Sequence, residues 1–360
     1  MTPQWPHNSF TKRFHLDFPL LLAPMAGFTT PELVSSISCA GGLGSLGAAH
    51  MSPKELRSAI EALRLKTHKP FIVNLYAASP TAASEQSIKA QVALNPYRKK
   101  LGLPGRFECL RPAYTFEDQL DVLIEEKIPI FSFSLGCISK SQRQRLEKAG
   151  IAVFGTATQL KEVKHLNQLR VDAIILQGEE AGGPRSTFLT PCREGLVSLL
   201  DLIPQAKEVS SLPLIAAGGI IHAKQIAAAL ILGADAVQMG TAFAICAESG
   251  APACFKEAFK KYMAKPTVLT EAYNGRLSRV IQTDFLKTLE KLPNAGFPDQ
   301  IHILSDLQTK CLSLPSIDFT PLFAGEGFSQ ASDRSALEIF YDLAQCTSLI
   351  FKELRQTKSS

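Results

Sequence analysis

Short apolar runs alternate with segments of helical periodicity along the first 250 residues, and this alternation limits the possible fold more than any other feature. Each run is bounded by Gly, Pro or polar residues, the pattern of a buried parallel strand. Eight such strands alternating with helices predict an α/β fold of the (β/α)8 or TIM-barrel type rather than an open sheet. The predicted strands are residues 19–25, 42–48, 70–76, 128–135, 150–156, 173–176, 213–217 and 234–239.

Two stretches depart from this repeat. Residues 77–114 have no clean period, contain four prolines and are too long for an ordinary βα connection, so we expect an insertion after the third strand. Beyond residue 250 we expect no strands, only helices and loops. The predicted organisation is a barrel of residues 1–250 with the 77–114 insertion, followed by a mostly helical appendage of residues 251–360 that helps to close the active site. Within the barrel, residues 195–211 predict a helix interrupted near Pro204.

Composition and charge exclude several classes of function. The chain has 360 residues, is 46% hydrophobic and carries a net charge of +5 without a long basic block, which suits a small anionic ligand better than a nucleic acid. Its eight cysteines form no C-x-x-C pair and no zinc-type spacing, so we expect no metal site. The absence of a signal-like start and of a membrane-length apolar run predicts a cytoplasmic protein with no membrane partner.

The predicted strand ends carry a recurring glycine pattern. In a barrel of this type the site forms at the C-terminal ends of the strands. The sixth strand is followed by E-E-A-G-G (179–183), the seventh by G-G (218–219) and the eighth by G-T (240–241). The last two suit a phosphate, because glycine lets the anion approach the backbone amides and the Thr241 hydroxyl donates as well. The alternative is that these glycines serve tight packing.

Over almost its whole length the sequence resembles the FMN-dependent nitronate monooxygenases, formerly called 2-nitropropane dioxygenases. Flavin-dependent enoyl-thioester reductases share much of the same pattern. The motifs that carry the resemblance are A-P-M-A-G (23–27), A-G-G-L-G-S-L-G (40–47), P-F-I-V-N-L (70–75), F-S-F-S-L-G (131–136), G-T-A-T (155–158), Q-G-E-E-A-G-G (177–183), P-L-I-A-A-G-G-I (213–220), A-D-A-V-Q-M-G-T-A-F (234–243) and N-G-R-L-S-R (274–279).

The resemblance implies FMN as the cofactor and assigns residues to it by motif match. The backbone of Pro24, Met25 and Ala26 would lie against the flavin ring. Asn74 and Gln177 would hydrogen-bond to its polar edge, and Gly182 and Gly183 would come close to the cofactor. The residues that would hold the phosphate are Gly218, Gly219, Gly240 and Thr241.

One position departs from the family pattern at the catalytic centre. In the family a histidine usually follows E-A-G-G and is proposed as the base that removes the α-proton of a nitroalkane, but here this position is Pro184. Proline has no titratable group, so it cannot be a general base. The W-A-G-Q-like motif near the C-terminus is also altered, to F-A-G-E (323–326).

Three enzymatic interpretations fit a flavin barrel without that histidine. We expect oxidation by O₂ of nitronates that arrive already deprotonated, with the flavin carrying the chemistry. Alternatively His50, after the second strand, or His222, after the seventh, replaces the missing base, although a lone loop histidine is more often a surface residue. The third is reduction of an enoyl thioester by NAD(P)H. A protein that keeps FMN without turnover is the non-enzymatic alternative.

Three arginines lie in the same motifs. Arg185 lies beside the Gly182-Gly183 pair, and we expect it either to attract an anionic substrate or to form a structural salt bridge. Arg276 and Arg279 match a motif in the C-terminal stretch, where a structural role is expected.

Overall fold

The computed structural model describes residues 5, 8–77, 85–108, 112–314 and 317–356. The parts of the predicted insertion and appendage that fall on 78–84, 109–111, 315–316 and 357–360 lie outside the described residues.

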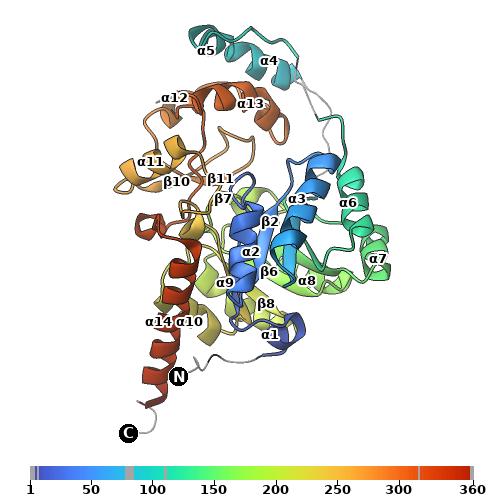
Figure 1. Cartoon of the computed structure of the whole chain (residues 1–360). Helices are drawn as coiled ribbons and strands as arrows, with labels where there is room; N and C mark the ends of the chain where they lie inside the picture. The colour runs from blue at the N-terminus through green and yellow to red at the C-terminus, as the bar shows by residue number, and fades with distance from the viewer. Residues whose placement is uncertain (1–4, 6–7, 78–84, 109–111, 315–316, 357–360) are drawn as a thin grey trace.

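The predicted barrel is present (Figure 1). Its strands are β1 (Leu20–Leu22), β2 (Gly44–Gly47), β3 (Phe71–Tyr76), β4 (Ile130–Ser134), β5 (Ala152–Ala157), β6 (Ala173–Gln177), β8 (Leu214–Ala217) and β9 (Ala236–Met239). They pair in parallel in the order β1-β9-β8-β6-β5-β4-β3-β2. A parallel bridge between Leu21 and Leu43 joins the two edges of this sheet. The sheet therefore closes as a (β/α)8 barrel.

Helices connect successive strands and begin where the sequence supplies a cap. Ser52 and Glu55 form a capping box at the start of α3 (Pro53–Lys66), with Pro53 as its first residue, as their spacing predicts. Helix α1 (Ser9–Phe14) precedes β1. The first seven barrel strands, β1 to β6 and β8, are followed in turn by α2 (Pro31–Cys39), α3, α6 (Phe116–Glu125), α7 (Lys140–Lys148), α8 (Leu160–Leu169), α9 (Leu199–Val209) and α10 (Ala223–Ile231).

The expectation for residues 195–211 needs correction. Helix α9 begins at Leu199, because Ser198 caps it by accepting a hydrogen bond from the Asp201 amide, and a separate 3-10 turn, η1 (Cys192–Gly195), precedes it. Pro204 lies inside the helix without ending it. The carbonyl that would have bonded to the missing N–H belongs to Leu200, an exposed residue, so water can satisfy it.

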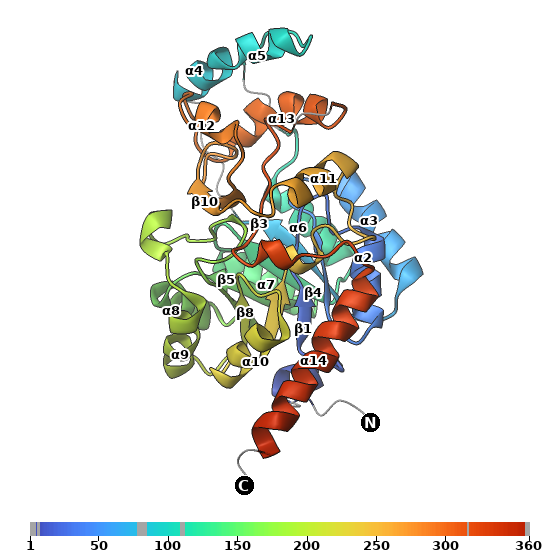
Figure 2. The same ribbon diagram turned by 90° about the vertical axis from the view of Figure 1, so that its left-hand side faces the viewer.

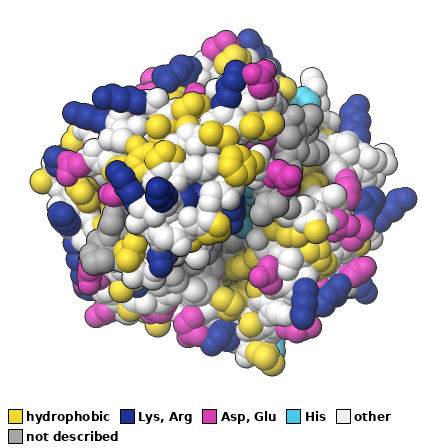
Figure 3. Space-filling model, turned by 90° about the horizontal axis from the view of Figure 1, so that it is seen from above, with side chains coloured by type: hydrophobic (Ala, Val, Ile, Leu, Met, Phe, Trp, Pro, Cys, Tyr) yellow, Lys and Arg dark blue, Asp and Glu magenta, His cyan; other side chains and the backbone are white. Residues whose placement is uncertain are grey.

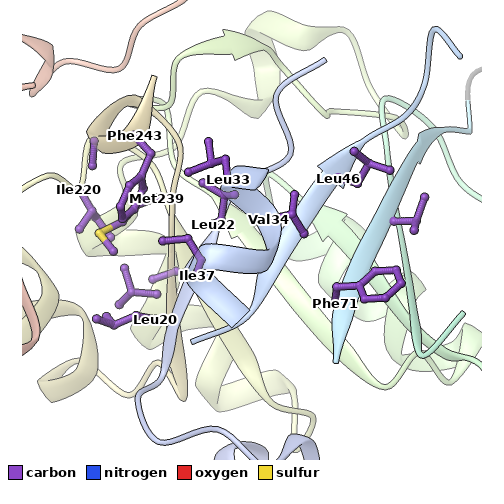
Figure 4. Packing of buried hydrophobic residues seen from close by; sticks show 14 of the residues in the cluster. Leu20, Leu22, Leu33, Val34, Ile37, Leu46, Phe71, Ile220, Met239 and Phe243 are labelled. Carbon is purple, nitrogen blue, oxygen red and sulfur yellow. The ribbon is translucent and has the colours of Figure 1, made fainter. Parts of the chain in front are cut away.

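Alternation along the strands builds two apolar layers. Leu20 and Leu22 point outward and pack against helix α2 through Leu33 and Ile37, as Figure 4 shows. Leu21, between them, belongs to a separate cluster that fills the barrel interior. Further members of that inner cluster are Leu43, Ile72, Ile130, Phe154, Ile175 and Ile215, closed below by Phe10 and Phe14 of α1.

The insertion and part of the C-terminal stretch share a third apolar cluster, which we call the cap. Helices α4 (Glu85–Ala93) and α5 (Asn95–Lys100) of the insertion pack on α12 (Leu286–Leu289) and α13 (Asp299–Cys311). Figures 1 and 2 show these four helices together above one end of the barrel. The buried guanidinium of Arg98 joins the two segments, with its Nε 2.8 Å from Asp306 Oδ2. The cap is thus built from residues that lie about 200 positions apart in the chain.

The expectation that strands are absent beyond residue 250 is wrong. Strands β10 (Thr267–Thr270) and β11 (Ser278–Ile281) form an antiparallel pair, and β11 also pairs with β7 (Gly183–Pro184) in the loop after β6. These strands are too short to show a period of two in the sequence, and their register depends on a distant partner.

The end of the chain returns to the barrel. After α11 (Ala253–Lys261), the cap and the turn η3 (Phe328–Gln330), helix α14 (Ala336–Gln356) packs against both α2 and α10. It therefore occupies the place of the helix that should follow β9 (Figure 2). None of the helices in the described ranges is long and apolar enough to span a membrane.

Candidate functional site

A cavity of about 440 Å³ opens at the C-terminal ends of the strands, beneath the cap. Its floor contains every position that the motifs assign to the cofactor, and its roof comes from α11, the cap and the segment that follows it. The assigned positions in the lining are Pro24, Met25, Ala26, Asn74, Gln177, Gly182, Gly183, Gly218, Gly219, Gly240 and Thr241.

The loop after β1 is held in the cavity wall by its neighbours. The Thr29 hydroxyl donates to the Met25 carbonyl at 3.0 Å and accepts from the Gly47 amide at 2.8 Å. A Cβ at Gly47 would lie 2.7 Å from the Met25 carbonyl carbon and from the Ala26 nitrogen, closer than real contacts allow. Glycine at the end of β2 is therefore what lets this loop pack, with its backbone at the cavity surface.

Asn74 lies at the floor of the cavity and is fixed by its neighbours on β4. Its side chain is buried, and Nδ2 donates to the Ser132 hydroxyl at 2.9 Å. This contact sets which way the amide faces.

His50 is the one predicted base that the structure brings to the cavity. Its ring opens into the cavity and meets the edge of the Tyr76 ring, with centroids 5.4 Å apart, while the Tyr114 hydroxyl donates to its carbonyl. His50 is exposed to the open cavity, but the protein around it removes part of its water and so lowers its pKa below the usual value, and repulsion by His302 lowers the pKa further. The imidazole is therefore neutral at neutral pH and able to accept a proton.

His222 lies elsewhere. It is the N-cap of α10, where Nδ1 accepts a hydrogen bond from the Lys224 amide at 3.1 Å, and it is not among the residues that line the cavity. The structure gives this histidine a capping role, against the expectation that it could replace the missing base.

Gln177 fastens the loop that follows its own strand. Its Nε2 donates to the Pro184 carbonyl at 3.0 Å, and its Oε1 accepts from the Ser186 amide at 2.8 Å. The side chain also lines the cavity, and beyond these two bonds its amide keeps one N–H and one oxygen lone pair, so the predicted hydrogen bond to a flavin edge stays a prediction.

Arg185 has neither of the roles expected for it. The side chain is fully buried, outside the cavity lining, and donates to the carbonyls of Gly178, Gln177 and Gly195. Burial lowers its pKa to about 10, with repulsion from Arg279 as a second cause, so the guanidinium stays charged at neutral pH. Its function is to hold the end of β6 and the following loop together.

Two arginines of the C-terminal stretch hold the same loop from outside. Arg276 Nε donates to the Arg185 carbonyl at 2.6 Å. Arg279 donates through Nε and Nη2 to the Glu179 carbonyl at 2.9 and 2.8 Å, and its Nη1 lies 3.0 Å from Glu326. These contacts are the structural role expected of the N-G-R-L-S-R motif.

The glycine turns after β6, β8 and β9 line the cavity together, on the side away from β2 and His50. Gly218 and Gly219 have φ values of +142° and +65°, which favour glycine. A Cβ at Gly182 would lie 2.4 Å from the Ala324 carbonyl carbon, so close chain packing explains this glycine. The F-A-G-E segment closes the group, because the Gly325 amide donates to the Thr241 hydroxyl at 3.0 Å.

Gln238 is a site residue that the motif reasoning overlooked. It lies on β9, is 5% exposed and lines the cavity, and its Nε2 has no hydrogen-bond partner among the residues that the structure describes. A buried donor without a partner is costly unless a ligand satisfies it. The signal was present in Q-M-G-T (238–241), where alternation along β9 turns Gln238 inward.

Comparison with known proteins agrees with this geometry. A family model described as nitronate monooxygenase matches residues 8–345. Two proteins of Staphylococcus aureus described as probable nitronate monooxygenases are 33% identical over 326 residues and 32% identical over 343 residues. These alignments cover 89% and 94% of this chain and 92% and 97% of theirs.

Solved structures give the same result. A nitroalkane oxidase from Streptomyces ansochromogenes superposes with a TM-score of 0.88 at 31% identity, covering 96% of this chain and all of the other. FabK from Thermotoga maritima superposes with a TM-score of 0.76 at 26% identity, over 98% of this chain and all of the other. The family match spans nearly the whole chain and includes the cavity residues. The chain therefore belongs to the nitronate monooxygenase family and is a flavin-dependent oxidoreductase.

Proposed function

We propose that this protein binds FMN in the cavity and oxidises alkyl nitronates with O₂. The observation that carries the proposal is Gln238, a buried amide donor without a described partner, at the floor of a cavity whose far end is a group of glycine turns. A planar ring rich in acceptors, joined to a phosphate, suits that combination of one buried donor and exposed backbone amides.

The residues present fit FMN. The backbone of Pro24–Ala26 and the Asn74 and Gln238 side chains would hold the flavin ring. Gln177 would bond to the ring edge through the rest of its amide while it fixes the loop that carries Gly182 and Gly183. The phosphate would lie against Gly218, Gly219, Gly240 and Thr241.

When bound, FMN would supply the redox chemistry by taking electrons from the nitronate and passing them to O₂. The side chains of this protein enclose and orient the substrate. A nitronate has already lost its α-proton, so proline at position 184 is no obstacle to its oxidation.

A neutral nitroalkane would need a base, and we propose His50 for that step. It is the cavity histidine, and its lowered pKa keeps Nδ1 or Nε2 free to take a proton at neutral pH.

Anaerobic stopped-flow spectroscopy of the purified holoenzyme tests the proposal. Butyl-1-nitronate should bleach the flavin absorbance, and admitting air should restore it with release of nitrite. Bleaching by NADPH alone would instead support the reductase alternative. Bleaching by neither would support a flavin-binding protein without this activity, and a protein that FMN cannot reconstitute would contradict the cofactor assignment.

A further inference from the structure

The roof of the cavity differs in chemistry from its floor. Apolar side chains from α11, from α13 and from the segments that flank α13 line the cavity on this side. They are Phe255, Phe297, Ile301, Leu312 and Phe323. The polar side chains of the roof are the uncharged Asn274, Gln308 and Thr320, and the amide of Asn274 is engaged by Ser278 and Arg276. This surface suits a hydrocarbon chain.

The side chains that line the cavity carry almost no charge. Among the described residues that line the cavity there is no Lys, Arg, Asp or Glu, and His50 is the only histidine. Burial raises the pKa of Tyr76 and of Tyr273 to about 12, so both stay neutral. Charged side chains are instead spread over the outer face of the molecule, as Figure 3 shows from above.

The nearby guanidinium groups are already engaged. Arg185 is buried against three carbonyls, Arg279 lies against Glu326, and Arg276 lies over the Phe297 ring, 5.6 Å from its centroid. An anionic group on the far part of a substrate would therefore lose its water and meet no Lys or Arg in the lining, and His302 of α13, which acts on His50 through its charge, is not a lining residue. That loss is expensive, because an unpaired buried charge keeps only a small part of its solvation.

From these observations we infer that the substrate's non-reacting part is an uncharged hydrocarbon chain lying under α13, and that the site discriminates against a second anionic group there. The inference rests on the proposed function for the identity of the reacting group, but the roof can be tested without turnover.

The first test compares two unreactive ligands of equal length on the FMN-loaded protein. Isothermal titration calorimetry should give a dissociation constant at least about tenfold lower for hexanamide than for adipamic acid, which carries a carboxylate at the far end. Equal affinities, tighter binding of adipamic acid, or no binding of hexanamide would overturn the inference, whichever reaction the protein catalyses.

A second test uses nitronates of similar size. Butyl-1-nitronate should reduce the flavin with a second-order rate constant at least about tenfold above that of propionate-3-nitronate. Comparable rates would contradict the selectivity. If neither nitronate bleaches the flavin, the proposed function fails, and the amide pair alone decides the inference about the roof.

A designed cation should weaken the preference for the uncharged ligand. Leu312 lies at the end of α13, lines the cavity and is 42% exposed, so Leu312→Lys can be tolerated by the fold. This variant should bind adipamic acid at least about fivefold more tightly than the unmodified protein. Leu349→Lys, on an exposed position of α14, is the matched control and should change neither affinity. An unchanged preference in a folded Leu312→Lys protein would count against the inference.

Discussion

At the scale of single residues, proline stands at position 184, where the family usually has a histidine. Removal of the α-proton and oxidation of the nitronate therefore do not both depend on this position. Removal of the α-proton requires a base, whereas oxidation of a preformed nitronate requires only an electron-rich anion beside the flavin. His50 reaches the same cavity from β2, on a different wall. The two steps can therefore be tested separately in this chain.

We expect His50→Gln to lower the rate with neutral nitroethane at least about 100-fold while leaving the rate with ethylnitronate nearly unchanged. The unmodified protein should gain nitroethane activity as pH rises through the pKa of His50. Because partial loss of water around the ring and repulsion by His302 lower that pKa, the rise in activity should fall below the usual pH range for histidine. Steady-state rates from pH 5 to 8 measure both effects. Equal losses with both substrates would show that His50 acts in binding rather than in proton transfer.

Substitution of Gly182 can show whether the glycine turns depend on one another for their packing. A methyl group in Gly182→Ala would meet the backbone of Ala324 and Gly325 at 2.4 and 2.5 Å, so the 323–327 segment must move. We expect a loss of about 1–3 kcal/mol in unfolding free energy and weaker retention of flavin, measured by denaturant titration and by absorbance after gel filtration. Gly105→Ala has only ordinary contacts, 3.6 Å and beyond, and should leave both unchanged. Full flavin content in Gly182→Ala would show that the turns are independent.

At the scale of elements, the barrel strands and the two segments that cover the site could be predicted, but the packing of these segments into one cap could not. Each barrel strand is buried on both faces, so it appears as a local apolar run such as Ala173–Gln177. The cap depends on contacts between α5 and α13, and β11 depends on Gly183–Pro184, so no local period indicates them. The same limit holds at the site. Glycine pairs mark strand ends in the sequence, but whether Gln177 or Gln238 offers a free amide depends on their neighbours in space.

The joint between α5 and α13 gives a prediction with a matched control. Arg98 is fully buried, while Arg106 approaches the same Asp306 carboxylate at 3.4 Å from a side chain that is 30% exposed. Arg98→Met should cost about 3 kcal/mol within the cap and raise hydrogen exchange in 85–106 and 299–311, because Asp306 loses its buried partner. Arg106→Met should cost less than about 1 kcal/mol. Hydrogen exchange detected by mass spectrometry measures both, and equal effects would mean that burial does not set the strength of this joint.

At the scale of the whole molecule, the chain is a barrel interrupted twice and then completed by its last helix. One interruption supplies α4 and α5, and the other supplies α11 to α13 with the β10–β11 pair. Both lie on the side where the strands end, and the cap forms an apolar cluster of its own, whereas α11 packs into the main barrel cluster through Phe255 and Phe259. This arrangement allows the roof to vary in chemistry while the floor keeps its glycine turns.

Phe340 of α14 shows whether that last helix belongs to the barrel. Its ring is fully buried, meets Phe18 edge-on with centroids 5.6 Å apart, and lies so close to Gly42 that a Cβ there would be 2.6 Å from it. Removing the ring in Phe340→Ala should therefore destabilise the barrel by about 3–5 kcal/mol and lower the midpoint of its thermal unfolding. Tyr341→Ala, at a neighbouring position that is 42% exposed, should cost less than about 1 kcal/mol. Thermal unfolding followed by circular dichroism and by flavin release compares the two. If α14 were an appendage, Phe340→Ala would leave the temperature of flavin release unchanged. If α14 completes the barrel, the same substitution should lower that temperature together with the midpoint of unfolding.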